Sequence, residues 1–178
     1  IPVDGEGQPL HNAIVWFDAR AEEEASSLGG ATAQAEFYRR TGFPSISGAF
    51  PIAKALWLRR HCPAVADRVR KFLLLEDYLL HWLTDEFVSE PTLQGSTGWF
   101  DIGRDALWDA MLDRAGLDRS LFPAVVPSGA VVGKIGGVTA KALGLGPDTR
   151  IVAGALDQAA AAVAGGNVAP GIVTETTG

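Results

Sequence analysis

The chain has 178 residues, 47% of them hydrophobic, and a formal net charge of -6, with 21 Asp and Glu against 15 Lys and Arg. This length and composition suffice to bury a hydrophobic core, either as one domain or as part of a larger protein. The acidic balance argues against a nucleic-acid partner or an anionic membrane surface, since both require clustered basic residues. A small ligand, neutral or complexed with a metal, is favoured instead.

The cysteine content and the hydropathy pattern indicate the compartment. The single cysteine, Cys62, cannot form an internal disulfide, and no basic segment followed by an apolar one opens the chain. The most apolar region, 151–164, is interrupted by Asp157 and Gln158, so no run reaches the roughly 18 uncharged residues of a membrane span. We therefore expect a cytoplasmic protein without a membrane segment.

Apolar runs alternate with helical patterns along the chain, which is typical of α/β proteins. The first part, DGEGQPL at 4–10, predicts a hairpin turn, and AIVWF at 13–17 predicts a buried strand. A helix is predicted over 19–28, because acidic residues come early and the pair Gly29-Gly30 follows.

The middle of the chain predicts three helices and a short strand. Pro51 is expected to open the first helix, in which four residues share one face: Lys54, Trp57, Leu58 and His61. FLLL at 72–75 predicts a buried strand, and a helical pattern follows at 76–84. An amphipathic helix is predicted over 107–115, with Gly116 as its end.

The last part of the chain places one carboxylate between an apolar run and a run of alanines. PSGAVVGKIGG at 127–137 predicts a loop and a short strand, and RIVAGAL at 150–156 predicts a strand that delivers Asp157 to its C-terminal end. Asp157 then has two interpretations. It is either the N-cap of the alanine-rich helix or a functional carboxylate at the strand end, where open α/β sheets place their ligand crevices.

Common catalytic signals are absent from the sequence. The histidines, His11, His61 and His81, have no metal-ligand spacing, and one cysteine cannot form a thiolate cluster, so a zinc site is not expected. No Gly-x-Ser-x-Gly elbow, Walker A loop or G-x-G-x-x-G after a strand occurs.

Four stretches occur in a fixed order along nearly the whole chain: PLHNAIVWFDAR, FPIAKALWLRRHCP, LLLEDYLLHWLTDEFVSEPT and GALDQAAAAVAGGNVAPG. Together they resemble the FGGY carbohydrate kinases, which include xylulokinase, glycerol kinase and gluconate kinase. The resemblance implies an α/β fold of two ribonuclease-H-like (actin-like ATPase) domains, with the active site in the cleft between them. Residues 1–170 would form the sugar-binding first domain without its N-terminal phosphate hairpin, and 171–178 would start the nucleotide-binding second domain.

The resemblance also implies a reaction, the ATP-dependent phosphorylation of a sugar or polyol hydroxyl. Such a transfer needs a carboxylate that orients the hydroxyl and takes its proton, and Asp157 occupies that position in the family pattern. Gln158 is expected to hydrogen-bond the sugar, and Trp16 to form an apolar wall against it. For Asp18 and Arg20, a ligand contact and a structural ion pair are both compatible with the sequence.

The same resemblance places the cofactor groups at the end of the chain or beyond it. Thr176, Thr177 and Gly178 are expected to contact the phosphates of ATP, and the Mg²⁺ site is expected outside this segment. Glu175 replaces a glycine of the family pattern, and a carboxylate near phosphates is unfavourable unless it points away. Ala49 stands where glycerol kinases have an aromatic contact, so a ketopentose such as xylulose is a better candidate than glycerol.

Two function classes therefore remain. The first is a carbohydrate kinase of which this chain is the central segment, inactive by itself and compatible with a homodimer. The second is a non-catalytic sugar-binding or regulatory protein that has kept the kinase fold.

Overall fold

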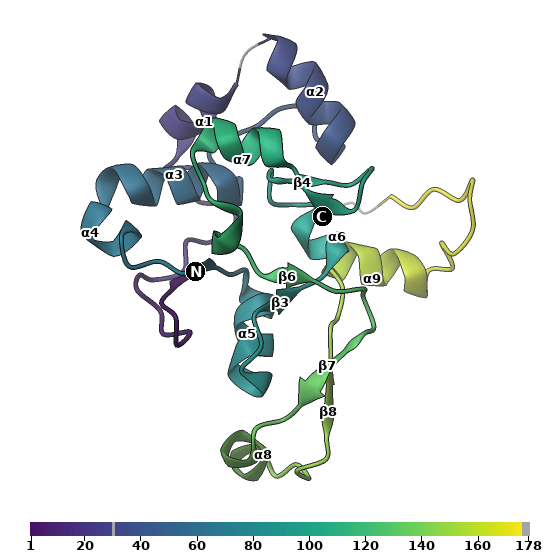
Figure 1. Ribbon diagram of the computed structural model, residues 1–178. Helices are drawn as coiled ribbons and strands as arrows, with labels where there is room; N and C mark the ends of the chain where they lie inside the picture. The colour runs from purple at the N-terminus through teal and green to yellow at the C-terminus, as the bar shows by residue number, and fades with distance from the viewer. Residues whose placement is uncertain (30, 176–178) are drawn as a thin grey trace.

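The computed structural model describes residues 1–29 and 31–175. Helices predominate, and the strands are short (Figure 1). In chain order the elements are β1 (Pro2–Val3), α1 (Glu22–Leu28), α2 (Ala31–Thr41), α3 (Pro51–His61), α4 (Pro63–Ala66), β2 (Lys71–Phe72), α5 (Leu75–Thr84), β3 (Val88–Ser89), α6 (Pro91–Gln94), β4 (Phe100–Asp101), β5 (Ala106–Leu107), α7 (Asp109–Ala115), η1 (Arg119–Leu121), β6 (Ala124–Val125), β7 (Val131–Lys134), α8 (Gly137–Leu143), β8 (Arg150–Val152) and α9 (Asp157–Ala164).

The main hydrophobic core lies between α1, α2, α3 and α7, and it extends to the strands β2 and β4. Its largest fully buried side chains include Phe37, Ile52, Leu58, Trp99 and Phe100. The local sequence explains where these helices begin and end. Pro51 is the first residue of α3, where its missing N–H is not needed, and Gly116 ends α7 with a φ of 62°, in the left-handed region.

The strands of the described residues pair into four separate two-stranded sheets. β3 and β6 are parallel, whereas β1–β2, β4–β5 and β7–β8 are antiparallel. A second hydrophobic cluster, formed by Leu80, Val88 and Ala153, joins α5 to the β7–β8 pair. β7, β8 and α8 extend below the helical body in Figure 1.

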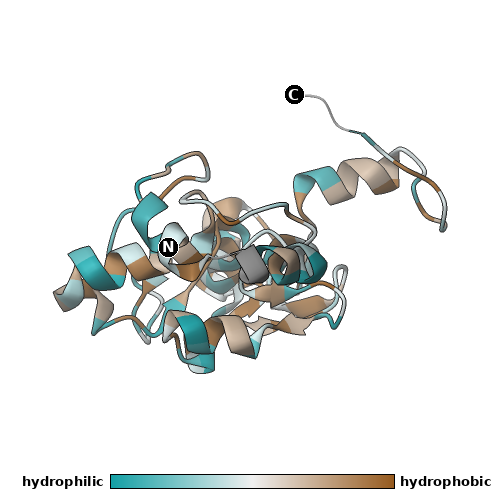
Figure 2. Ribbon diagram, turned by 90° about the horizontal axis from the view of Figure 1, so that it is seen from above, coloured by the Kyte–Doolittle hydropathy of each residue, from teal (hydrophilic) through white to brown (hydrophobic). Residues whose placement is uncertain are grey.

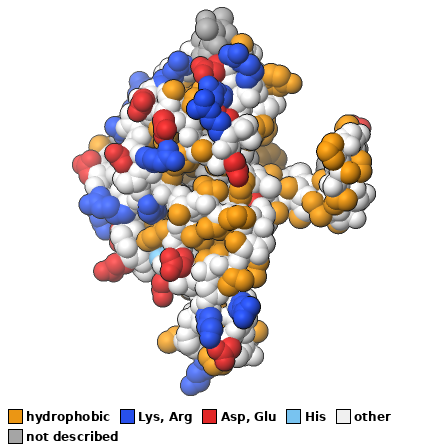
Figure 3. Space-filling model, turned by 45° about the vertical axis from the view of Figure 1, so that its right-hand side comes forward, with side chains coloured by type: hydrophobic (Ala, Val, Ile, Leu, Met, Phe, Trp, Pro, Cys, Tyr) orange, Lys and Arg blue, Asp and Glu red, His pale blue; other side chains and the backbone are white. Residues whose placement is uncertain are grey.

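α9 and residues 165–175 project from the body as a separate arm, which is clearest in Figure 2. None of the residues of α9 is buried. Figure 3 shows hydrophobic side chains gathered on this arm, and the large ones among them are Val163, Val168, Ile172 and Val173. The position of α9 therefore depends on the chain that connects it to β8.

Most predicted helices and the hairpin turn are confirmed. A turn follows Asp4, whose carbonyl accepts a hydrogen bond from Gly7 N at 3.2 Å. The predicted helices appear as α1, α3, α5 and α7, although α1 begins only at Glu22 and α7 only at Asp109. No helix of the described chain is both long and apolar enough to span a membrane.

Three strand predictions need correction. The predicted strand at 72–75 is confirmed only at Phe72, the last residue of β2, because the chain leaves the strand after it and Leu75 already belongs to α5 and is 67% exposed. The strand within RIVAGAL is confirmed as β8, but it pairs antiparallel with β7. The rule for ligand crevices in open parallel sheets therefore does not apply to it within the described residues. The predicted strand at 13–17 is wrong, as the next section explains.

Candidate functional site

The segment at 13–17 is an exposed turn, and the prediction of a buried strand there is wrong. Trp16 is 81% exposed and Phe17 is 68% exposed. The backbone turns at Val15, whose carbonyl accepts from Asp18 N at 3.1 Å. No strand pairs with this segment in the part of the chain that the structure describes. The aromatic side chains of AIVWF therefore form part of an exposed surface and do not belong to a core strand.

Lys54 of α3 supplies hydrogen bonds to the backbone carbonyls of this turn, which in a sheet would come from a neighbouring strand. Its Nζ donates to the carbonyl of Val15 at 2.8 Å and to the carbonyl of Trp16 at 3.2 Å. Burial lowers the pKa of this amine below its ordinary value, and the nearby carboxylate of Asp18 partly opposes that effect. A buried amine thus fixes the backbone that carries Trp16.

Asp18 and Arg20 form the ion pair that the sequence left as one of two interpretations. Arg20 Nη2 donates to Asp18 Oδ2 at 2.7 Å, and Arg20 Nε lies 3.0 Å from both carboxylate oxygens. The hydrogen bonds from Arg20 lower the pKa of Asp18 to about 2. The guanidinium of Arg20 also lies 4.9 Å from the centre of the Trp57 ring, a cation–π distance. The pair is therefore held rigidly beside the Trp16 turn.

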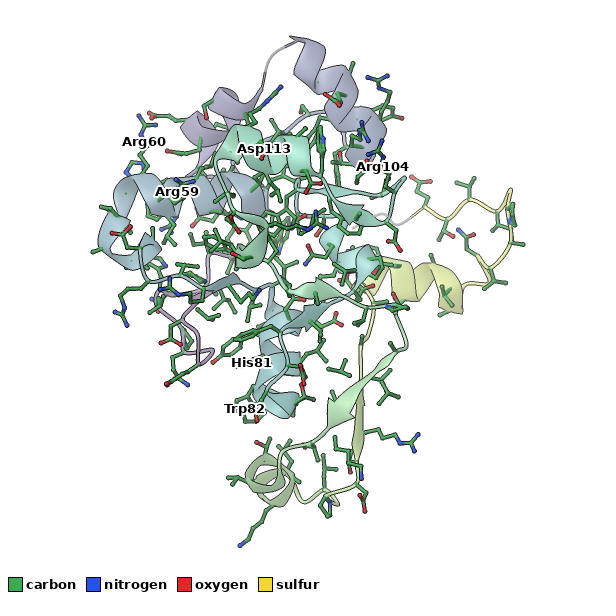
Figure 4. All side chains as sticks on the ribbon, viewed as in Figure 1. Arg59, Arg60, His81, Trp82, Arg104 and Asp113 are labelled. Atoms are coloured by element: carbon green, nitrogen blue, oxygen red, sulfur yellow. The ribbon has the colours of Figure 1, made fainter. Side chains whose placement is uncertain are left out.

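The histidines have partners that are not metal ligands. The ring of His61 stacks on Trp57 at 5.0 Å, and that of His81 stacks on Phe87 at 4.1 Å. In Figure 4 His81 and Trp82 lie on α5, away from Arg59 and Arg60 of α3. Across residues 1–29 and 31–175, no group of three or more His, Cys, Asp or Glu side chains is arranged to hold a metal ion.

Asp157 is the first residue of α9, and the interpretation of it as the N-cap is wrong. Leu156 occupies the cap position, with no hydrogen bond from its side chain. Asp157 Oδ1 accepts from the adjacent Gln158 N at 2.8 Å, and both side chains are exposed. The second carboxylate oxygen has no hydrogen-bond partner within the described ranges. The geometry thus leaves one oxygen of an accessible carboxylate available for chemistry.

The connection from β8 to Asp157 is fixed by its backbone amides. Ala153 N donates to Ala130 O at 2.9 Å, which continues the pairing toward β7. Gly154 N donates to Glu76 Oε1 at 2.9 Å, and Leu156 N donates to Thr92 Oγ1 at 2.8 Å. A side chain at Gly154 would bring a Cβ to 3.1 Å from Glu76 Oε1, so glycine suits this close approach. Two helices, α5 and α6, therefore hold the residues just before Asp157.

The predicted site residues form two groups. Trp16, Asp18 and Arg20 lie together beside α3, and Asp157 and Gln158 lie together on α9. No hydrogen bond or ion pair among the described residues joins the groups directly. α6 and the turn after it connect them, because Ile52 N of α3 donates to Thr97 O at 3.1 Å while Thr92 holds Leu156.

The sequence did not assign a role to several residues that build this arrangement: Lys54, Glu76, Glu90, Thr92 and Ser128. The segment Ser-Glu-Pro-Thr carries a local signal for one of them, because a carboxylate before a proline is typical of a helix N-terminus. Glu90 indeed caps α6. Its contact with Ser128 lies 38 residues away in sequence and has no such signal. The predicted ATP contacts, Thr176, Thr177 and Gly178, lie outside the described residues, and Glu175 is exposed.

Comparisons with known proteins agree on one family. Residues 1–164 match the model of the FGGY family of carbohydrate kinases, N-terminal domain. The chain is 36% identical to a xylulose kinase of Streptomyces coelicolor over 183 residues, which covers 100% of the chain and 36% of that relative. It is 33% identical to a xylulose kinase of Escherichia coli, with 93% of the chain and 34% of the relative covered.

The structure agrees with a solved member of the same group. The crystal structure of xylulose kinase from Rhodospirillum rubrum matches with a TM-score of 0.87 and 27% identity, covering 96% of this chain and 35% of that one. The expected ribonuclease-H-like, actin-like fold is thereby confirmed for the N-terminal domain. The chain spans about a third of the length of these relatives.

Proposed function

Because the chain belongs to the FGGY family of carbohydrate kinases, we propose that it is the sugar-binding part of an ATP-dependent kinase. Its substrate is a ketopentose such as xylulose, since two of its relatives are xylulose kinases. The reaction transfers the terminal phosphoryl group of ATP to a sugar hydroxyl. Residues 1–170 form the first domain and 171–178 begin the second, and the 178 residues alone do not turn over ATP.

The accessible carboxylate of Asp157 is the observation that carries the proposal. One of its oxygens is held by Gln158 N, and the other is available to accept the proton of a sugar hydroxyl. Removing that proton leaves the hydroxyl oxygen as the nucleophile that bonds to phosphorus, while the bond from phosphorus to the leaving oxygen of ADP breaks. We infer that the side-chain amide of Gln158, one residue further on, hydrogen-bonds a second hydroxyl of the sugar.

The other group supplies the walls of the sugar site. Trp16 presents an exposed apolar face, and aromatic faces bury large areas against the carbon skeleton of a ligand. The Asp18–Arg20 pair and Lys54 hold the backbone beneath it. ATP binds as its Mg²⁺ complex, and the metal neutralises charge on the phosphates. By the family resemblance, the residues that hold Mg²⁺ are expected outside this segment.

We place the enzyme in the cytoplasm, where ATP and a reducing environment suit a protein with one cysteine. Its partner is a small sugar, because the negative net charge disfavours nucleic acid and anionic membranes. The alternative, a non-catalytic sugar-binding or regulatory protein, predicts the same fold without turnover, so sugar-dependent turnover by the full-length wild-type protein separates the two.

The test is Asp157→Asn in the full-length protein. The carbonyl of the amide still accepts from Gln158 N, so the melting temperature should not change. The loss of the base should lower kcat by about 10²- to 10⁴-fold. Asp109→Asn is the matched control, because Asp109 is the exposed first residue of another helix, α7. A wild-type protein with no sugar-dependent turnover supports the non-catalytic alternative. An Asp157→Asn variant with more than half of the wild-type kcat contradicts the base assignment.

A further inference from the structure

α9 carries the proposed base but has no side-chain packing of its own. None of its residues is buried, and it projects from the body (Figure 2). A helix that buries no face is not oriented by a core, because packing provides most helical stability in proteins. The orientation of Asp157 therefore depends on the hydrogen bonds of the residues just before it.

One of those hydrogen bonds leads to a buried carboxylate. Leu156 N donates to Thr92 Oγ1 at 2.8 Å, and Thr92 Oγ1 in turn lies 2.7 Å from Glu90 Oε1. Glu90 is 0% exposed and has no basic partner among the described residues. Its oxygens accept from uncharged donors, which include Thr92 N at 2.8 Å and Ser128 Oγ at 2.6 Å. The chain from Glu90 to Asp157 thus has two intermediates, the Thr92 hydroxyl and the Leu156 amide.

The chemistry of a hydroxyl makes this chain directional. Threonine has one hydroxyl proton and two lone pairs. When the hydroxyl donates its hydrogen bond to the carboxylate of Glu90, only lone pairs remain to face Leu156, so Thr92 acts as an acceptor there. Glu90 therefore fixes the hydroxyl in the one orientation that binds the Leu156 amide.

We propose that Glu90 and Thr92 are positioning residues for Asp157, an inference that rests on the proposed function. Neither touches the substrate. The Glu90 carboxylate orients the Thr92 hydroxyl, the hydroxyl holds Leu156 N, and this bond sets the start of α9 and the direction of the Asp157 carboxylate. Ser128, from the segment before β7, holds Glu90 from the other side.

A simpler interpretation is that Glu90 only caps α6, since it also accepts from the amides of Thr92 and Leu93. The two interpretations differ in the role of the Thr92 hydroxyl. A cap of α6 needs only the backbone N–H of residue 92, which every residue except proline has. Positioning of Asp157 needs the hydroxyl. Substitutions at Thr92 therefore separate them.

The experiment uses the full-length protein with Thr92→Val, Thr92→Ser and Glu90→Gln. Misplacing a catalytic group by about 1 Å can cost on the order of 10²-fold in rate, so we expect Thr92→Val to lower kcat by about 10- to 100-fold. The KM for sugar should change much less, and Thr92→Ser should restore kcat because it restores the hydroxyl. Glu90→Gln should act in the same direction as Thr92→Val.

The matched control is Thr97→Val, three residues beyond α6. Thr97 is also buried and its hydroxyl also donates locally, to Gln94 O at 2.6 Å, but it makes no contact with the residues before α9. Thr97→Val should lower the melting temperature without the loss of kcat. Hydrogen exchange gives a readout apart from activity, because the amide of Leu156 should exchange faster in Thr92→Val and at the wild-type rate in Thr97→Val.

A double variant tests whether Thr92 acts through Asp157. In the Asp157→Asn background, Thr92→Val should lower kcat no further, because the group that it positions is already gone. If Thr92→Val keeps the kcat of Thr97→Val while Asp157→Asn is impaired, the positioning proposal is wrong and the proposed function stands. If Asp157→Asn is fully active, the assignment of Asp157 as the base is wrong. Whether Thr92 holds the start of α9 is then decided by hydrogen exchange of the Leu156 amide alone. If this amide exchanges at the wild-type rate in Thr92→Val, the positioning proposal is wrong.

Discussion

The buried carboxylate of Asp77 gives a prediction that is independent of activity. Asp77 lies in the first turn of α5 and is 0% exposed. Its Oδ2 accepts from Leu74 N at 2.9 Å, but its Oδ1 has no hydrogen-bond partner among the residues that the structure describes. Burial raises the pKa of this carboxyl from 3.8 to about 6, because a buried carboxylate loses its hydration. The folded protein therefore binds this proton more tightly than the unfolded chain.

The sign of the stability effect follows from this difference. Below pH 3.8 the group is protonated in both states and has no effect on stability. Between pH 3.8 and about 6 the unfolded chain ionises first, so the free energy of unfolding falls as the pH rises. A difference of about two pH units corresponds to about 3 kcal/mol, fully developed above pH 6. Asp77→Asn removes this penalty and keeps an acceptor for Leu74 N.

We therefore expect Asp77→Asn to raise the free energy of unfolding by about 1 to 3 kcal/mol at pH 7, and by much less at pH 4. The lower end of this range applies if the new side-chain amide at position 77 buries an N–H without an acceptor, because an unpaired buried donor is itself destabilising. Equilibrium urea unfolding between pH 4 and pH 7, followed by tryptophan fluorescence, measures the difference.

Asp85→Asn is the matched control for this titration. Asp85 is exposed at the other end of α5, with a φ of 64° that asparagine tolerates well, so the same chemical change there should leave the pH dependence unaltered. If Asp77→Asn destabilises the protein equally at pH 4 and pH 7, the desolvation argument is refuted, since only the lost packing or hydrogen bond would then matter.

Two further predictions concern the Trp16 side of the site. Trp16→Ala should weaken sugar binding but change stability by less than about 1 kcal/mol, because the side chain is 81% exposed; Phe17→Ala is the control, and a loss of about 3 to 5 kcal/mol in thermal melts would instead indicate a core residue. Lys54→Met should destabilise the protein by about 1 to 3 kcal/mol and also raise the KM for sugar, because two carbonyls of the Trp16 turn lose their donor. Lys71→Met removes a similar pair of bonds, to the carbonyls of Ser120 and Phe122, so an equal rise in KM there would contradict a specific role for Lys54.

Local chemistry allowed the helices to be predicted from the sequence. Pro51 begins α3 and Gly116 ends α7, because the requirements at helix ends involve only neighbouring residues. The four stretches in order were enough to identify the family, and the comparisons confirmed it. Neither kind of information depends on contacts between distant parts of the chain.

The predictions failed where burial depends on distant segments. AIVWF reads as a core strand because a strand and an exposed aromatic turn have the same local composition, and only a neighbouring strand would distinguish them. Asp157 reads as an N-cap because Asp before a run of alanines is a strong cap signal. The helix starts one residue earlier than that signal implies, because Thr92 holds Leu156 N at the cap position.

The candidate site shows why the proposed catalytic residue and the residues that support it differ in how well they can be predicted. Asp157 was proposed as the base from the family pattern that its stretch of sequence resembles. The bond from Leu156 to Thr92 spans 64 residues, and that from Gly154 to Glu76 spans 78. A backbone N–H can donate to any suitably placed oxygen, so the sequence next to Asp157 does not indicate which residue supplies that oxygen. The carboxylate of Asp77 belongs to the same support, since it holds the first turn of α5, in which Glu76 precedes it. A buried charge that lowers stability at neutral pH is therefore located where it helps to fix the segment that carries the proposed base.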